Sequence, residues 1–182
     1  MAEEASKRTS ARRKKQSVDL DTLGLEMGNR PPQALDVEEA VLGALLIEPN
    51  CIDEAMDELT PNCFYSEKHR MIFEAMRQLS NEHVALDILS VSQKLKANGN
   101  LEIVGGTVAL VQLSQKIGAA AHIDYYIRIL KQKCIQRELI TASYDILKTS
   151  YDDATNVDDL IDMAQTKVFA AIQNNVKKDV QE

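Results

Sequence analysis

The feature that most constrains the fold is the segment 119–150, which contains neither Gly nor Pro. Its apolar residues recur every three or four positions, the period of one face of an α-helix. These positions are Ile123, Tyr126, Ile127, Leu130, Cys134, Ile135, Leu139, Ala142, Ile146 and Leu147. A helix of about 30 residues is about 45 Å long, at 1.5 Å per residue. We expect it to extend beyond any globular part that the rest of the chain can form.

A second helix is predicted to fold back along the first. A turn at 151–156 precedes it, where Thr155 or Asn156 can cap the helix and Asp158 and Asp159 suit its first turn. Its apolar positions are Val157, Leu160, Ile161, Ala164, Val168 and Ile172, with Phe169 as a further candidate. Two antiparallel helices cannot bury all of this apolar surface between them. We therefore expect the hairpin to associate with another copy of the chain or with a different protein.

The preceding segment, 31–118, predicts a small helical head. Caps and helix breakers indicate helices at about 36–47, 51–59, 67–80, 88–98 and 107–117. Asp36 and Glu39 resemble a capping box, and Asp87 can cap the helix that follows it. Gly43 lowers helix propensity, which indicates close approach of another helix. The expected fold class is all-α: a small multi-helix globular head followed by a long antiparallel α-helical hairpin.

Composition agrees with helices and separates a basic N-terminus from an acidic body. Aromatic residues make up only 4% of the chain, and the few Gly and Pro argue against a many-turned β-sandwich or barrel. The net charge is −7, yet residues 1–30 carry a balance of +2. We expect 1–30 to be a disordered tail, serving as a solubilising arm or as a phosphate-binding arm. Its basic residues are Lys7, Arg8, Arg12, Arg13, Lys14 and Lys15.

The sequence contains no pattern that predicts catalysis. His69, His83 and His122 lack partners at metal-binding spacing, and no phosphate-loop motif G-x-x-x-x-G-K-[ST] occurs. We therefore expect no catalytic, cofactor-binding or metal-binding residues in this chain, and no enzymatic activity of its own. The three cysteines follow no secretory segment, so we expect reduced thiols in a cytoplasmic protein. No apolar run is long enough to span a membrane.

Four segments, in order, resemble a known family. They are PPQALDVEEAVLGALLIEP, CFYSEKHRMIFEAMRQL, ANGNLEIVGGTVALVQLSQ and AAAHIDYYIRILKQKCIQRELITAS. Together they are similar to the N-terminal domain of bacterial replicative DNA helicases of the DnaB type. The resemblance covers about 31–175, and agreement in both order and spacing is more specific than any single motif.

This resemblance implies an assembly role. In the family, hairpins such as 119–175 pair, and the pairs form a collar on a hexamer, a trimer of dimers. The collar also docks the C-terminal domain of primase, and the hexamer handles single-stranded DNA. We assign a partner interface to positions on the hairpin stripes: Tyr126, Ile127, Leu130, Leu139, Tyr144, Leu147, Leu160 and Met163. Each of these also fits the alternative of a residue buried inside the hairpin.

The motor functions of the family have no counterpart in these residues. ATP and Mg²⁺ would belong to a C-terminal motor domain beyond Glu182, and residues 176–182 would begin the linker to it. We therefore expect a fragment of a longer protein. Two alternatives remain open: a DNA-binding regulator of the helix-turn-helix type that uses the basic tail as an arm, and a stand-alone helicase adaptor.

Overall fold

The computed structural model describes residues 28–48, 51–116 and 122–173. The chain divides into two units, Met1–Arg30 and Pro31–Glu182. All helices named below belong to the second unit. The predictions of a basic tail at 1–30 and of a linker beginning at 176–182 therefore concern residues outside the described part, apart from Gly28, Asn29 and Arg30.

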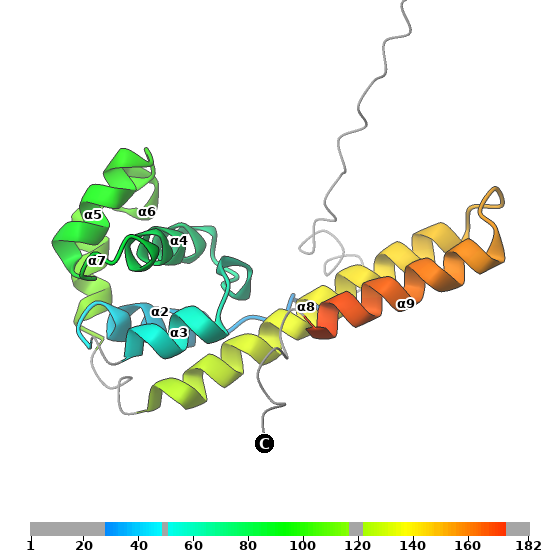
Figure 1. Cartoon of the computed structure of the whole chain (residues 1–182), viewed down its shortest axis with the longest axis horizontal. Helices are drawn as coiled ribbons and strands as arrows, with labels where there is room; N and C mark the ends of the chain where they lie inside the picture. The colour runs from blue at the N-terminus through cyan, green and yellow to red at the C-terminus, as the bar shows by residue number, and fades with distance from the viewer. Residues whose placement is uncertain (1–27, 49–50, 117–121, 174–182) are drawn as a thin grey trace, which may run out of the picture. The chain divides into compact units, whose positions relative to one another are not determined.

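The second unit is all-α in its described part, as the sequence predicts (Figure 1). The elements in chain order are α2 (Leu35–Leu45), α3 (Ile52–Glu58), the 3₁₀ turn η2 (Pro61–Cys63), α4 (Glu67–Asn81), α5 (Ile88–Ala97), α6 (Leu101–Val104), α7 (Gly106–Ser114), α8 (Ile123–Ser150) and α9 (Val157–Gln173). Helices α2 to α7 build the head. Helices α8 and α9 form the antiparallel hairpin.

The head core forms around α2, which packs against α4, α7 and α8. Leu42 and Leu45 of α2 are fully buried, and the rings of Phe64 and Phe73 meet with their centroids 4.7 Å apart. The N-terminal half of α8 belongs to the same core. Its buried residues there are Ile123, Ile127, Leu130 and Cys134. The long helix is therefore anchored in the head at one end before it continues into the hairpin.

Gly43 allows α2 and α7 to approach closely. A Cβ atom at this position would lie 2.3 Å from the backbone carbonyl oxygen of Leu113. Only a residue without a side chain fits there, because the backbone of Leu113 cannot rotate away as a flexible side chain would. The close approach that the sequence predicts at Gly43 is confirmed.

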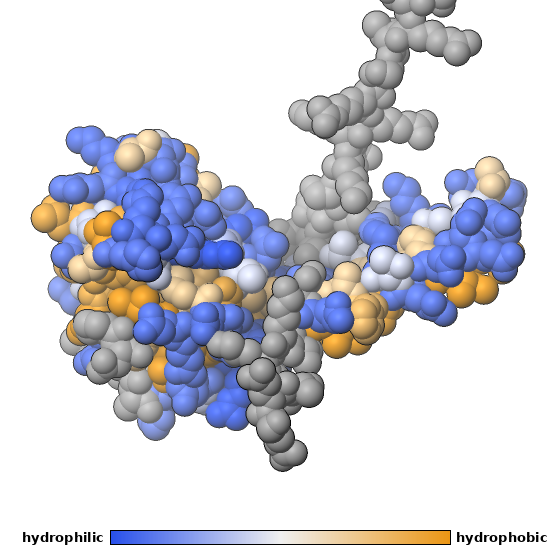
Figure 2. All heavy atoms as spheres, in the orientation of Figure 1, coloured by the Kyte–Doolittle hydropathy of each residue, from blue (hydrophilic) through white to orange (hydrophobic). Residues whose placement is uncertain are grey.

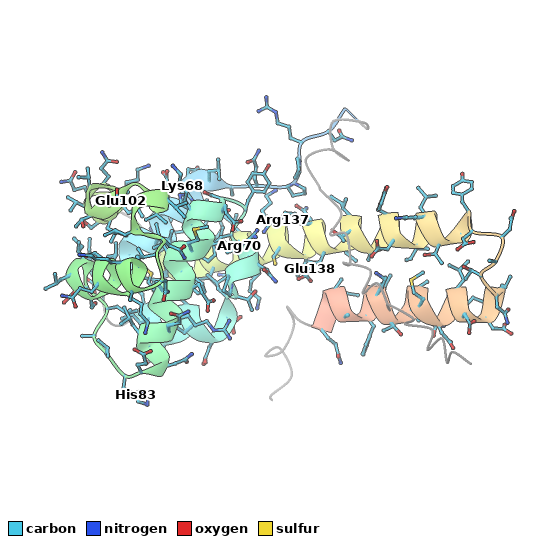
Figure 3. The ribbon with its side chains drawn as sticks, turned by 90° about the horizontal axis from the view of Figure 1, so that it is seen from above. Lys68, Arg70, His83, Glu102, Arg137 and Glu138 are labelled. Carbon is cyan, nitrogen blue, oxygen red and sulfur yellow. The ribbon has the colours of Figure 1, made fainter. Side chains whose placement is uncertain are left out.

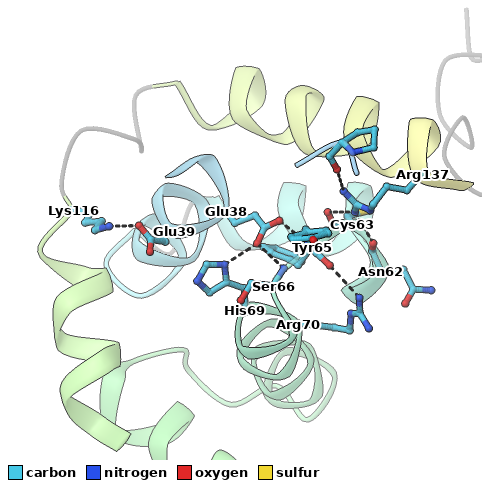
Figure 4. Close-up of polar contacts among 12 residues, drawn as sticks. Glu38, Glu39, Asn62, Cys63, Tyr65, Ser66, His69, Arg70, Lys116 and Arg137 are labelled. Carbon is cyan, nitrogen blue, oxygen red and sulfur yellow. Dashed lines mark hydrogen bonds and ion pairs between the residues drawn. The ribbon is translucent and has the colours of Figure 1, made fainter. Parts of the chain in front are cut away.

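A buried carboxylate joins α2 to the start of α4 (Figure 4). Glu38 is 1% exposed, and its side chain accepts hydrogen bonds from the backbone N–H of Tyr65 at 2.6 Å and of Ser66 at 3.3 Å. Nδ1 of His69 lies 2.7 Å from the same carboxylate. Glu38 thus ties the two residues before α4, and the His69 side chain in its first turn, to α2.

Other helix ends show where local signals suffice. Asp87 caps α5 through the Ser90 N–H at 2.7 Å, which lowers the pKa of Asp87. The Asn156 side chain accepts from the N–H of Asp158 at the start of α9. The capping box predicted at Asp36 and Glu39 is wrong. Helix α2 begins at Leu35 after Ala34, without a side-chain cap, and Glu39 instead forms an ion pair with Lys116.

Replacing Gly43 by Ala tests the α2–α7 contact. The new methyl group improves helix propensity by about 1 kcal/mol, but overpacking against a backbone atom costs about 1–3 kcal/mol. We expect a lower free energy of unfolding in urea. Ser143→Ala, on the exposed side of α8, should leave stability nearly unchanged. Equal or greater stability of Gly43→Ala would contradict the close contact.

Neighbouring glutamates offer a matched test of the buried carboxylate. Glu38→Ala leaves the Tyr65 N–H and His69 without their acceptor, and should cost about 2–3 kcal/mol of unfolding free energy. Glu39→Ala removes a partly exposed ion pair and should cost about 0–1 kcal/mol. Equal losses in thermal or urea unfolding would show that Glu38 does not have the structural role assigned to it.

Candidate partner interface

The hairpin exposes large apolar side chains along α9. Val157, Ile161, Val168 and Ile172 are 66%, 49%, 38% and 43% exposed. They are separated by four, seven and four residues, so they lie on one face of the helix. We call these four residues the α9 stripe. Figure 2 shows apolar surface along one edge of the hairpin.

Helix α9 uses a second, adjacent face to pack against α8. Leu160, Met163 and Ala164 are half-buried there, and Ala171 is 5% exposed. Lys167 completes this contact through an ion pair with Asp145 of α8. Among the described residues, α9 therefore has more apolar positions than its neighbour α8 covers. The α9 stripe is the excess.

The residues predicted to meet a partner fall into three groups. Leu147 is 54% exposed and is available to another molecule. Four residues of the hairpin, namely Leu139, Tyr144, Leu160 and Met163, are half-buried. The remaining three, namely Tyr126, Ile127 and Leu130, lie in or against the head core.

This last placement removes Ile127 and Leu130 from the interface. They are 2% and 0% exposed within their own chain, and Tyr126 packs partly buried beside them. Helical periodicity marked these positions as apolar correctly. It does not reveal that the first half of the long helix is a core helix of the head.

The helical period predicts the four positions of the α9 stripe as apolar, but the period alone assigns them no partner role. The sequence feature that indicates a partner role for the α9 stripe is the width of the apolar surface of the helix. Val157, Ile161, Val168 and Ile172 form one line along the helix, and Leu160, Ala164 and Ala171 form another. One antiparallel neighbour covers one such line, so a helix with two lines needs a second partner.

Arg137 fixes the point where the hairpin leaves the head (Figures 3 and 4). Its guanidinium is 6% exposed and donates to the carbonyl oxygens of Pro32 at 2.8 Å, Asn62 at 3.0 Å and Cys63 at 2.8 Å. These acceptors come from the segment before α2 and from η2. An ion pair between Lys131 and Glu58 adds a second tie, from α8 to α3. The start of the hairpin is therefore held by polar contacts as well as by packing.

A hollow in the head lies among α2, α4 and α7. It has a volume of about 440 Å³, with Lys68, His69 and Lys116 at its wall. Among the described residues, no group of three or more His, Cys, Asp and Glu side chains could hold a metal ion.

Two further predictions concern nucleic acid and membranes. The basic residues Lys7, Arg8, Arg12, Arg13, Lys14 and Lys15 lie outside the described residues. Helix α4, which a DNA-binding regulator could use for recognition, directs Arg70 to Glu67 at 3.0 Å and to the Phe64 carbonyl at 3.4 Å. In the part of the chain that the structure describes, no helix combines the length and apolarity needed to cross a membrane.

Comparisons with known proteins agree on one family. The family of DnaB-like helicase N-terminal domains matches residues 30–132. The replicative DNA helicase DnaB of Rhodothermus marinus is 34% identical over 161 residues, which is 88% of this chain and 17% of that protein. The DnaB of Geobacillus stearothermophilus is 34% identical over 143 residues, which is 79% of this chain and 32% of that protein. The chain thus spans at most about a third of these relatives.

Solved structures share the fold. The crystal structure of the N-terminal domain of DnaB helicase from Mycobacterium tuberculosis has a TM-score of 0.72 at 28% identity, covering 77% of this chain and 99% of that one. A structure of a DnaB-like replicative helicase and its interactions with primase has a TM-score of 0.62 at 22% identity, covering 74% and 30%. The family match spans more than half of the chain, and its arrangement of helices is that of a DnaB N-terminal domain. The chain therefore belongs to the family of DnaB-like helicase N-terminal domains.

Proposed function

We propose that this chain is the collar domain of a replicative DNA helicase, and that it holds copies together through its hairpin and docks primase. The observation that carries the assembly part is the α9 stripe, four aliphatic side chains exposed on a helix already paired with α8. A second hairpin from another copy is the occupant that best matches such a line of residues. The spacing of four, seven and four suits helix pairing.

The size of the stripe favours a reversible pair. Burying a half-exposed Val or Ile contributes about 1 kcal/mol, and a symmetric pair counts each residue twice. The resulting total of about 8 kcal/mol is similar to the cost of association, about 4–15 kcal/mol. Leu147 and Phe169, 54% and 60% exposed, would add to the contact. We therefore expect dimers that depend on concentration, and a stable hexamer only with further contacts.

The contacts that hold the hairpin to the head would also fix the position of each head relative to the paired hairpins. Arg137 and the buried half of α8 hold the hairpin to the head. A pair of hairpins would then carry two heads at a set separation, as a collar built from three pairs requires. The heads would remain available to a different partner.

Primase is proposed as that partner because of likeness to a known assembly. The DnaB-like replicative helicase whose structure was described with its interactions with primase has the same fold as this chain. Helicase activity is proposed only for a longer protein. ATP, Mg²⁺ and single-stranded DNA would be bound by a motor portion that these 182 residues do not include, in the cytoplasm at the replication fork.

Charge placed on the α9 stripe should prevent self-association. In Ile161→Glu and Val168→Glu, pairing would bury carboxylates at the contact. The apparent dissociation constant of the dimer should therefore rise at least tenfold. Light scattering after size exclusion, over a range of concentrations, measures it. Thr166→Glu adds the same charge on the exposed polar face of α9 and should leave the dimer intact.

Two results would contradict the proposal that the α9 stripe mediates self-association. A strictly monomeric parent at high concentration would refute the assembly proposal. So would equal weakening by Thr166→Glu and Ile161→Glu, because a general charge effect would then explain both. Circular dichroism of each variant verifies that its helices remain formed.

Primase docking is tested separately. We expect the isolated C-terminal domain of the cognate primase to bind this chain in a pull-down and in calorimetry. If docking uses the head, Ile161→Glu should retain affinity per chain, because the α9 stripe lies on the hairpin. Absence of binding by both this chain and its full-length hexamer would remove the docking part of the proposal, and leave the assembly part standing.

A further inference from the structure

A cleft opens on the head between α4 and α7. Both helices pack on α2, and the cleft has a volume of about 440 Å³. Its floor is apolar, because the buried side chains of Ile72, Val104 and Leu113 line it. Val108 lies at its rim and is 67% exposed. Ligand-binding pockets have volumes of about 300–1,000 Å³, so the cleft has room for apolar side chains of another molecule.

The cleft is a basic site on an acidic body. Residues 31–182 carry a net charge of −9, because the whole chain carries −7 and residues 1–30 carry +2. The charged side chains that line the cleft are nevertheless two lysines, Lys68 and Lys116, and one carboxylate, Glu39. A negatively charged group is therefore attracted to the cleft, although the body as a whole repels it.

Both lysines have N–H donors available for a ligand. Lys68 lies in the first turn of α4 (Figure 3), is exposed, and forms no ion pair within the described ranges. Lys116 follows α7 and forms an ion pair with Glu39 (Figure 4). An ammonium group has three donors, so Lys116 can bind a second carboxylate while Glu39 holds it at the wall. The cleft thus offers one anion contact from α4 and another from the end of α7.

His69 is a third polar group in the lining, and its ring is held in place. Its Nδ1 lies 2.7 Å from the buried Glu38 carboxylate, which also accepts a hydrogen bond from the Tyr65 N–H. Because that carboxylate is an acceptor, Nδ1 carries a proton, and Nε2 is the ring nitrogen that remains for a ligand. When Nε2 is protonated as well, the ring can donate to a carboxylate in the cleft. A group that is positioned in advance lowers the entropic cost of binding.

We propose that this cleft docks an amphipathic helix of a partner protein, in which Asp or Glu lies beside an apolar residue. The apolar side chain enters the cleft and covers Ile72 and Val104. The neighbouring carboxylates pair with Lys68 on one side and with Lys116 on the other. Apolar burial supplies the affinity, and the charges select an acidic partner over a basic one.

The exposed rim of the cleft favours a protein over a small molecule as the occupant. Small ligands bury about 70–90% of their surface, whereas Lys68, Val108 and Gln112 leave this cleft open to solvent. Val111 lies three residues from Val108 on α7 and is 38% exposed, so the apolar surface continues beyond the cleft. A helix that inserts one side chain can lay its next apolar residues along this surface, as in other helix-in-groove contacts.

This docking site differs from the surface proposed for self-association. The cleft lies on the head, and the α9 stripe lies on the hairpin. The inference states the chemistry of a partner and does not require that partner to be primase. It therefore goes beyond the proposed function and can fail without it.

The test uses a synthetic helical peptide of about 15 residues, long enough to form a helix, with Leu along one face and Glu beside it. We expect it to bind the full 182-residue chain in fluorescence anisotropy, more weakly as NaCl is added. A peptide with Gln in place of Glu should bind roughly fivefold more weakly, since two partly exposed ion pairs are lost. Backbone amide signals in NMR should shift at Lys68, Gln112 and Lys116, and not along α9.

A charge-reversed variant with a matched control locates the site. Lys68→Glu should weaken binding of the acidic peptide and strengthen binding of a peptide with Lys in place of Glu. Glu suits the first turn of a helix, so the variant should fold, which circular dichroism verifies. Lys96→Glu makes the same charge change at an exposed position of α5 outside the cleft, and should leave both affinities unchanged.

Four results would overturn the docking site. They are no binding of the acidic peptide at millimolar concentration, equal weakening by Lys68→Glu and Lys96→Glu, amide shifts confined to the hairpin, and equal binding of the Glu and Lys peptides by the parent chain. Weaker self-association of Lys68→Glu in light scattering would assign the cleft to a second copy of the chain instead. Light scattering of Ile161→Glu and the primase pull-down test the proposed function separately.

Discussion

The burial of one half of α8 in the head is the constraint on which the rest of the structure depends. Ile123, Ile127, Leu130 and Cys134 complete the head core, while the helix continues to Ser150 without a Gly or Pro to end it. Its backbone hydrogen bonds are satisfied internally, so nothing stops it at the edge of the head. In the part of the chain that the structure describes, the second half of α8 then leaves the core and packs against α9. The exposed α9 stripe is a direct consequence.

Buried polar groups decide where the elements join. Arg137 and Glu38 are 6% and 1% exposed, and each contacts several hydrogen-bonding groups of other elements. An unpaired charge at such a position would be costly, so only the arrangement that supplies these partners is tolerated. Packing supplies most of the stability, and these contacts select the geometry. In the proposed collar, that geometry sets how a pair of hairpins would carry its two heads.

Features that depend on neighbouring residues could be predicted from the sequence, and features that depend on distant residues could not. The long helix, the returning helix, the Asp87 cap and the close approach at Gly43 follow from signals within a few residues of one another, and the structure has each of them. The short helix α6 was not predicted, because four residues are too few to show a period. The Asp36 cap was wrong because α2 begins one residue earlier, at Leu35, which places Asp36 inside the first turn.

The sequence by itself determined that the chain is helical, that it contains a long hairpin and which family it resembles, because helical period, caps and segment order are properties of neighbouring residues. Only the tertiary structure decided which apolar positions remain open. Ile127 and Ile161 look alike in a periodic pattern, yet one is 2% exposed and the other 49%. The reason is physical: burial depends on which distant elements pack together, and Arg137 contacts Pro32 and Cys63 across 105 and 74 positions of the sequence.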